Sequence, residues 1–178
     1  MPFVRVTYQA GAITAKQKAE LAEDITHALL IMEAGADTPE GRSVACVFFE
    51  EVNPASDWFV GGKLDKNGPA SGRFLFDVTI PEAAADQSAK AAFHVAVNDS
   101  VARILGVDGT FPNRIGDWVM IREIANGSWG VGGLTVGIRN IAELLKYIPE
   151  KTEYLEGLLA AQKRLREAHS FPAGVSLL

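Results

Sequence analysis

Residues 119–133 read VMIREIANGSWGVGG, a strand followed by a turn that closes with Trp129 and a pair of glycines. An earlier stretch, NPASDWFVGG at residues 53–62, closes in the same way with Trp58 and its own glycine pair. The two tryptophans lie 71 residues apart, and the two glycine pairs have the same separation. One separation shared by matching landmarks indicates a repeated structural unit.

The segments in front of these two turns also repeat in the same order. Residues 2–8 alternate in polarity as a half-buried strand does, and residues 74–80 alternate in the same way. A helical apolar stripe follows each strand and ends at Gly35 in the first case and at Gly106 in the second, again 71 residues apart. The chain therefore uses a strand–helix–strand–turn unit twice.

The two pseudo-repeats span residues 2–62 and 73–133, within a single domain that covers residues 1–178. Because a helix connects the two strands of each unit, we expect these strands to run parallel. Residues 44–52 are apolar on both faces over most of their length, which predicts a central strand covered on both sides. Cys46 lies in this run, and we expect its thiol to be buried and inert.

A C-terminal helical extension, residues 135–178, follows the second unit. The stretch LTVGI at residues 134–138 predicts a short strand, residues 140–147 a short helix, and residues 152–168 a charged amphipathic helix. A helix with this many charged residues is usually solvated or packed on a partner subunit. It carries no recognisable chemical motif.

The composition is that of an ordinary globular protein, with 178 residues of which 48% are hydrophobic and 22% charged. The net charge is −5 and the basic residues are scattered, so no nucleic-acid partner is expected. We expect a cytoplasmic protein without a membrane partner, because there is no long apolar run or signal-peptide pattern and the single cysteine fits a reducing compartment. No cofactor is expected, since metal-ligand spacings and nucleotide-binding loops are both missing.

The chain begins Met1-Pro2, which places a proline at the head of the first predicted strand. Proline has no backbone N–H for a sheet ladder, so the first position is one of the few that it can take in a strand. Together with the doubled unit and its Gly-Gly turns, this start resembles the tautomerase superfamily. The similarity is greatest to fused two-unit members related to 4-oxalocrotonate tautomerase, cis-3-chloroacrylic acid dehalogenase and malonate semialdehyde decarboxylase, and it covers about residues 2–135.

This resemblance implies an α+β fold in which duplicated β-α-β units form a four-stranded sheet with two helices on one face. It also implies a homotrimer and catalysis by Pro2 as the mature N-terminus. We expect Met1 to be removed, because the residue that follows it is small. An α-amino group has a reference pKa of about 7.7–8.0, and burial in an apolar pocket lowers that pKa further. A general base works best with a pKa near the working pH, so a neutral Pro2 is suited to keto–enol proton transfer.

Arginines that bind substrate carboxylates in the superfamily are missing from the matching positions. The positions that match the arginines of 4-oxalocrotonate tautomerase hold Ala12, Cys46 and Trp118. The stretch PEAA at residues 81–84 stands where the dehalogenase and the decarboxylase carry paired arginines. A planar bidentate guanidinium is hard to replace. We therefore do not expect dehalogenation or decarboxylation by the known routes, or a dicarboxylate bound in the usual way.

Five other residues are candidates for a substrate pocket. Arg122 is the first candidate for binding an anionic or enolate oxygen, and Trp118 projects from the same face of its strand. Trp129 matches an aromatic residue of the 4-oxalocrotonate tautomerase site, and Trp58 is its partner in the first unit. Arg42, in the loop before the second strand, can reach the mouth of the pocket. The alternatives are a surface arginine at a sheet edge and tryptophans that anchor their hairpins.

The counterpart of Pro2 in the second unit is Arg73, which is either part of a binding-only site or, more simply, a charged strand end in solvent. Two functions stay open for the whole chain. The first is a cofactor-independent tautomerase or isomerase that uses Pro2 on a small carbonyl compound or unsaturated acid. The second is a catalytically silent trimer that serves as a binding or scaffold protein. A hydratase, dehalogenase or decarboxylase of the same superfamily is a further alternative.

Overall fold

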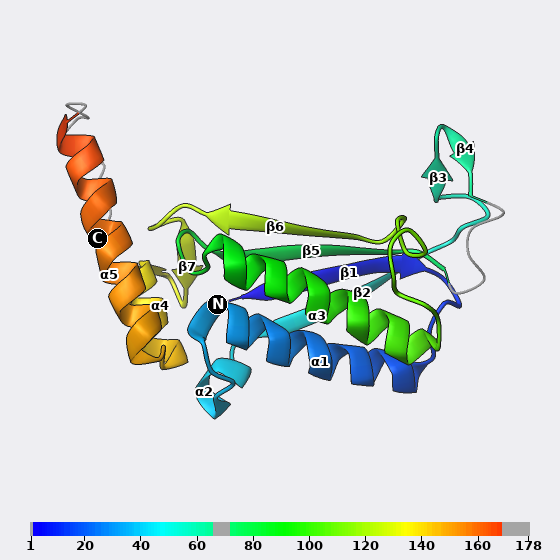
Figure 1. Ribbon diagram of the computed structural model, residues 1–178, viewed down its shortest axis with the longest axis horizontal. Helices are drawn as coiled ribbons and strands as arrows, with labels where there is room; N and C mark the ends of the chain where they lie inside the picture. The colour runs from blue at the N-terminus through cyan, green and yellow to red at the C-terminus, as the bar shows by residue number, and fades with distance from the viewer. Residues whose placement is uncertain (1, 66–71, 169–178) are drawn as a thin grey trace.

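The computed structural model describes residues 2–65 and 72–168. Its elements follow the order β1 (Phe3–Gln9), α1 (Ala15–Ala34), α2 (Pro39–Arg42), β2 (Cys46–Val52), β3 (Phe59–Val60), β4 (Lys63–Leu64), β5 (Phe74–Pro81), α3 (Gln87–Leu105), β6 (Trp118–Ile124), β7 (Trp129–Val131), β8 (Leu134–Val136), α4 (Ile138–Leu145) and α5 (Pro149–Ala168). A four-stranded sheet has the order β2-β1-β5-β6, and the pairs β3–β4 and β7–β8 form two small hairpins. Figure 1 shows α1 and α3 side by side on one face of the sheet. The predicted α+β fold of duplicated β-α-β units is confirmed.

The long helices of the two repeated units, α1 and α3, end at the glycines that the sequence predicts. The Thr14 hydroxyl accepts a hydrogen bond from the Gln17 N–H (3.3 Å), and the Gln17 side-chain oxygen accepts one from the Thr14 N–H (2.9 Å), which completes a capping box. Gly35 ends α1 in the left-handed conformation, with φ of 78°. In the second unit Asp86 caps α3, and Gly106 ends it with φ of 66°. Both helix ends use the conformation that glycine adopts most readily.

The strands of each unit run parallel, as predicted, and β1 pairs antiparallel with β5 to join the two units. Alternate side chains of β1 and β5 point toward α1 and α3 and are at most 1% exposed. They are Val4, Val6, Tyr8, Phe74, Phe76, Val78 and Ile80. Burial of apolar surface, at roughly 25 cal/mol per Å², is the main force that holds the helices on this face. The repeat boundaries at residues 62 and 73 stay a prediction.

The strand β2 differs from its prediction. The apolar pattern of residues 44–52 predicts a central, covered strand, whereas β2 is an edge strand of the sheet in this chain. Phe48 is 56% exposed, and Cys46 is exposed as well, so the prediction of a buried thiol is also wrong. Phe48 pairs with Arg5 on the face of the sheet away from α1. The physical reason is that the chain's own helices cover only one of the two apolar faces of β2.

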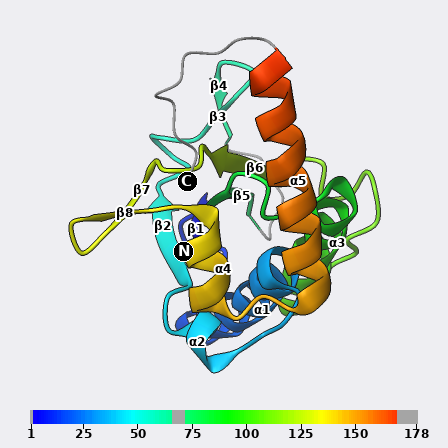
Figure 2. The ribbon, with the colours of Figure 1, turned by 90° about the vertical axis from the view of Figure 1, so that its left-hand side faces the viewer.

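The C-terminal helices α4 and α5 pack at the end of the sheet where β1 starts. The Ile148 N–H donates to the carbonyl of Ala34 (3.1 Å), and the Lys151 ammonium donates to the carbonyl of Met32 (2.6 Å), both in the last turn of α1. Figure 2 shows α4 beside the start of β1 and α5 continuing past the sheet. Residues 169–178 of the predicted extension lie outside the described residues.

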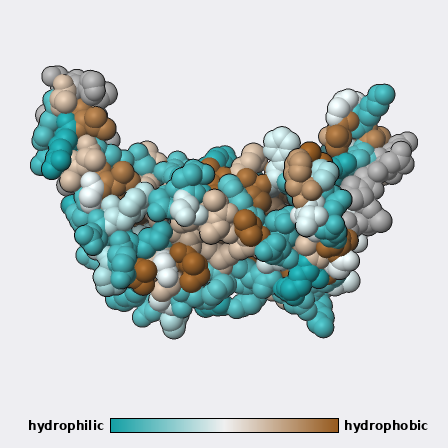
Figure 3. All heavy atoms as spheres, viewed as in Figure 1, coloured by the Kyte–Doolittle hydropathy of each residue, from teal (hydrophilic) through white to brown (hydrophobic). Residues whose placement is uncertain are grey.

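The face of the sheet opposite α1 and α3 is hollow. Figure 3 shows this hollow between two rising arms, which are α5 and the β3–β4 hairpin. Trp118 and Met120 of β6 lie on this face and are 62% and 42% exposed. An exposed apolar area of this kind marks an interaction surface. None of the described helices combines the length and the apolar character needed to cross a membrane.

Candidate active site

Pro2 lies directly before β1, at the end of the sheet that α4 covers. The residue is buried, and its carbonyl oxygen accepts a hydrogen bond from the Cys46 N–H (3.2 Å). Pro2 therefore extends the β1–β2 ladder through its carbonyl, at a position where proline's missing N–H is tolerated. Met1 lies outside the described residues, so its removal stays a prediction.

Pro2 lines a pocket of about 720 Å³, a volume typical of small-molecule sites. The lining residues are Pro2, Phe3, Arg5, Val44, Cys46, Phe48, Phe49, Glu50 and Trp129. Apolar side chains dominate, and the two charged ones, Arg5 and Glu50, have opposite signs. An apolar cavity with a few polar groups both binds and orients a small ligand. Among the described residues, no cluster of three or more His, Cys, Asp or Glu side chains could hold a metal ion.

Trp129 brings the second unit to the same pocket as Pro2. It begins β7, where it pairs with Val136 of β8, and its side chain is half-buried. The indole N–H is buried and has no hydrogen-bond partner in the described part of the chain. A buried donor without an acceptor costs about 1–3 kcal/mol, so a ligand with an acceptor at this point would gain affinity.

Two predicted pocket residues lie elsewhere in the chain. Trp58 lies between β2 and β3, at the far end of the sheet from Pro2. The Arg42 guanidinium donates to Asp37 (2.7 Å) and to Glu23 (2.9 Å), which holds it beside α1. The hydrogen bond from Arg42 keeps the pKa of Asp37 at about 2. Neither Trp58 nor Arg42 lines the Pro2 pocket of its own chain.

Arg122 and Trp118 lie on the hollow face, on a strand that β5 separates from β1. The Arg122 guanidinium donates through two nitrogens to the Asp77 carboxylate, and its Nε lies 2.9 Å from the Asp77 oxygen. Neither residue lines the Pro2 pocket of the same chain. Arg122 and Trp118 can therefore contact a substrate only in the pocket of a neighbouring chain, and this contact stays a prediction.

Arg5 is a pocket residue that the sequence did not single out. It is the cation among the described residues that line the pocket, and it makes no ion pair with them. Strand alternation places it on the same face as Phe3, away from the core. That alternation was readable in the sequence, but it indicates only an exposed side chain and gives no sign of a pocket.

A buried carboxylate at the same end of the sheet was also missed. Glu33, in the last turn of α1, is 0% exposed, and its Oε1 accepts a hydrogen bond from the Tyr147 hydroxyl (3.2 Å). Burial raises the pKa of Glu33 to about 7, and the charge of the chain's amino terminus acts in the opposite direction. The sequence did hold one sign that Glu33 is buried. Glu33 follows Leu29 by four residues, which places it on the apolar stripe of the helix.

Arg73, the counterpart of Pro2 in the second unit, forms an ion pair with Asp65. The Arg73 Nε donates to the Asp65 carboxylate (2.5 Å), which also accepts from the Gln9 amide (3.1 Å). The guanidinium packs against Gly116, where an added Cβ would lie 1.8 Å from Nη1 of Arg73. The expectation of a strand end in solvent is wrong, since the Arg73 side chain is only 22% exposed.

No protein-family model matches this chain, and no curated protein matches its sequence. Several solved structures match its fold. A native fused 4-OT is 22% identical, with a TM-score of 0.59 over 75% of this chain and 94% of that chain. N1, a member of the cis-3-chloroacrylic acid dehalogenase family, is 20% identical, with a TM-score of 0.60 over 87% of this chain and 99% of that one. A fused 4-OT described as a symmetric trimer is 23% identical, with a TM-score of 0.57 over 75% of this chain and 94% of that chain.

These matches bear on the fold, because sequence identities this low carry no information on the reaction. They cover 75–87% of this chain and 94–99% of the proteins compared. The resemblance stated from the sequence is therefore confirmed at the level of architecture. The chain has the fold of fused 4-OT, with two β-α-β units in one chain.

Proposed function

We propose that the protein is a cofactor-independent tautomerase or isomerase in which Pro2, freed by removal of Met1, transfers a proton on a small carbonyl compound or unsaturated acid. The observation that carries this proposal is the place of Pro2, which is buried in the wall of an apolar pocket of about 720 Å³. Burial disfavours the cation, so a free secondary amine there is neutral at lower pH than in water. The fold shared with fused 4-OT fits this proposal but does not by itself identify the reaction.

In this proposal the neutral Pro2 nitrogen removes a proton from the carbon next to the substrate carbonyl. The electron pair of that C–H bond forms a C=C bond, and the carbonyl oxygen becomes an enolate. The protonated Pro2 nitrogen, a pyrrolidinium ion, then returns the proton to another atom of the same substrate, so no co-reactant is consumed. Arg5 is placed to bind a carboxylate or the enolate oxygen, and the Trp129 indole N–H is a second donor.

We also propose that the chain forms a homotrimer, as described for a fused 4-OT. The exposed apolar face of the sheet supports an assembly, because Phe48, Trp118 and Met120 all lie on it. In such a trimer Arg122 and Trp118 belong to the contact surface and are candidates for the pocket of the neighbouring chain.

A catalytically silent trimer is the second candidate function. One specific observation favours it, which is that Ala12, Cys46 and Trp118 stand where arginines bind the substrate in the resembling family. In the first proposal, Arg5 takes the place of these missing substrate-binding arginines. The two candidates therefore differ in whether the processed protein turns over any substrate.

The test compares two forms of the protein after intact mass spectrometry has shown whether methionine is absent. One form begins at Pro2, with a free amino group. The other carries one glycine in front of Pro2, which turns the Pro2 nitrogen into an amide. We expect the capped form to lose turnover of phenylpyruvate-type enols by about 10²–10⁴-fold, the usual contribution of a general base. Equal turnover in both forms rules out the Pro2 mechanism. A processed protein without activity on a broad set of enols and haloacrylates favours the silent trimer.

A further inference from the structure

Three segments meet around the buried carboxylate of Glu33, and two of them belong to the C-terminal extension. Glu33 itself comes from the last turn of α1. Tyr147, directly after α4, donates its hydroxyl hydrogen to Oε1 of Glu33 (3.2 Å). Lys151 of α5 donates to the carbonyls of Met32 (2.6 Å) and Ala84 (3.5 Å), which locks α5 onto the same helix end. The extension thus shields Glu33 from water.

The other carboxylate oxygen of Glu33, Oε2, is buried without a hydrogen-bond partner among the described residues. An ionised carboxylate in such a place is unfavourable unless a positive charge stands close by. The groups that face it electrostatically are the Tyr147 hydroxyl, the Lys151 ammonium and the charge of the amino terminus. Burial keeps the pKa of Tyr147 well above its ordinary value, so this hydroxyl stays a donor, and Lys151 is engaged with backbone carbonyls.

The remaining cation is the amino group of the chain that begins at Met1, and its charge lowers the pKa of Glu33. The fold accounts for this effect, because α1 runs back along the sheet and ends where β1 begins (Figure 1). Once Met1 is removed, the amino group is the nitrogen of Pro2, the residue that precedes β1. A buried carboxylate and the proposed catalytic amine then lie at the same end of the sheet.

We propose that Glu33, held by Tyr147 of the C-terminal extension, is the counter-charge that sets the protonation state of the Pro2 nitrogen. This inference rests on the proposed function, since it needs a free Pro2 amine. Glu33 acts through Pro2 and is a positioning residue. The two groups share one proton, as a neutral acid beside a neutral amine or as a carboxylate beside a pyrrolidinium ion. The proton only moves between the two groups, so the total charge of the pair is the same in both forms.

This shared proton decides which chemistry Pro2 performs. The carboxylate form of Glu33 stabilises the protonated Pro2 nitrogen and raises the pKa of the amine, which favours Pro2 as an acid. The neutral form of Glu33 leaves Pro2 uncharged and favours it as a base. Because the groups interact, the two observed titration midpoints belong to the pair. The C-terminal extension affects the proton transfer because it supplies Tyr147 and shields Glu33 from water.

The test follows the Pro2 nitrogen directly, by NMR titration of processed protein labelled with ¹⁵N-proline. We expect the midpoint of Pro2 to fall by about one pH unit or more in Glu33→Gln, the usual effect of losing an opposite charge nearby. Tyr147→Phe should shift it in the same direction by less, because the carboxylate loses the donor that favours its ionised form. Glu143→Gln removes an exposed carboxylate of α4 and serves as the charge-matched control, with an unchanged midpoint. The acidic limb of the kcat/KM profile should move with the NMR midpoint.

The outcomes separate this inference from the proposed function. A protein that keeps Met1, or a capped form with full turnover, ends the proposed function before Glu33 is tested. An active, processed protein whose Pro2 midpoint is the same in wild type and Glu33→Gln overturns the inference and leaves the proposed function standing. If Glu33→Gln does not fold, Tyr147→Phe decides, and a midpoint equal to that of the wild type overturns the inference.

Discussion

Among single residues, Trp58 and Trp129 offer the sharpest comparison, because they occupy matching places in the two units. Only Trp129 lines the Pro2 pocket. Trp58 lies at the far end of the sheet, where its carbonyl accepts a hydrogen bond from the Asp65 N–H (2.9 Å). The same substitution at both positions therefore separates a pocket role from a structural one.

We expect Trp129→Ala to lower kcat/KM by about tenfold or more, because it removes an apolar wall and an unpaired donor worth at least ~1.4 kcal/mol in binding. Trp58→Ala should leave kcat/KM within about twofold of the wild type. Steady-state kinetics on processed protein measures both values. Equal losses in the two variants would mean that the pocket assignment of Trp129 is wrong.

Glu33 links the stability of the chain to pH. Burial raises its pKa from 4.5 to about 7, so the folded chain holds this proton more tightly than the unfolded chain. The free energy of unfolding that comes from Glu33 is fully present below pH 4.5 and is lost as the pH rises toward 7. The difference amounts to roughly 3 kcal/mol.

Glu33→Gln does not titrate, so its stability relative to the wild type should improve by roughly 3 kcal/mol between these two pH values. Urea unfolding of both proteins below pH 4.5 and above pH 7, at one protein concentration, measures the change. Parallel pH profiles of the two proteins would show that Glu33 does not titrate in this window.

The sequence predicted the part of the site that rests on motifs and missed the part that rests on tertiary contacts. Pro2 and Trp129 were identified because each belongs to a recognisable pattern, and the pocket contains both. Arg5 and Glu33 were missed because their roles appear only once β1 and the end of α1 meet other elements. Cys46 was misplaced because an apolar pattern does not reveal whether the cover comes from the same chain.

At the level of elements, the ends of α1 and α3 differ in what surrounds them. Both end in a left-handed glycine, with φ of 78° at Gly35 and 66° at Gly106. A Cβ added at Gly35 would lie 2.5 Å from Cδ1 of Ile148, at the junction between α4 and α5, whereas a Cβ at Gly106 meets nothing within 4 Å. The first helix end is therefore closed by the C-terminal extension, and the second is open.

Alanine at either glycine should cost about 1–2 kcal/mol for the left-handed backbone. Gly35→Ala should cost a further ~1–3 kcal/mol, because Ile148 must move out of a packed junction. Urea unfolding of both variants gives the two losses side by side. Identical losses would contradict the tight packing of the extension against α1.

The elements themselves were predictable where the signal is local. The capping box at Thr14 and the glycines at the helix ends fix α1 and α3 through contacts between residues close in sequence. The order of the strands is not local, and for this reason the edge position of β2 was missed. The α5 helix is intermediate, because its charge pattern predicted a helix but gave no sign of how it contacts the rest of the chain.

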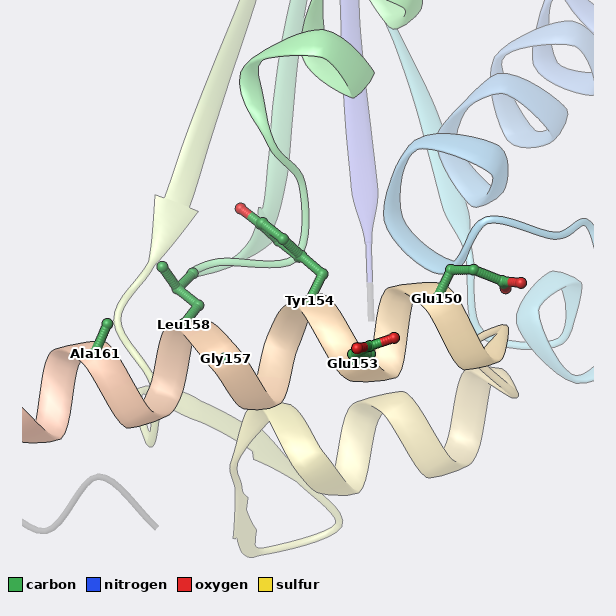
Figure 4. A pocket seen from close by; sticks show the side chains of 6 residues that line it. All are labelled: Glu150, Glu153, Tyr154, Gly157, Leu158 and Ala161. Atoms are coloured by element: carbon green, nitrogen blue, oxygen red, sulfur yellow. The ribbon is translucent and has the colours of Figure 1, made fainter.

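For the molecule as a whole, the C-terminal helix shapes the hollow face. A second pocket of about 540 Å³ runs along α5. Figure 4 shows Tyr154, Leu158 and Ala161 projecting from α5 toward the end of the sheet. Together with the β3–β4 hairpin at the other end, α5 bounds the hollow on the side that α1 and α3 do not cover (Figure 3). A second chain seated in this hollow would contact both arms and the floor between them.

The last prediction tests this assembly with two matched substitutions. Met120 lies on the hollow face, paired with Asp77 of β5, while Val95 of α3 is exposed on the helical side at 60%. An aspartate at Met120 places a second carboxylate beside Asp77 and has to be desolvated when chains meet, which costs several kcal/mol for each contact. An aspartate at Val95 stays in water.

We therefore expect light scattering to give a trimer of the 19.1 kDa chain for the wild type and Val95→Asp, and a single chain for Met120→Asp, at the same concentration. If neighbouring chains complete the pocket through Arg122 and Trp118, turnover should fall together with the measured mass and should recover at higher protein concentration. A wild type that scatters as a single chain would remove the trimer. A monomeric Met120→Asp with full turnover would show that each chain holds a complete site, with Arg5 as the cation that serves it.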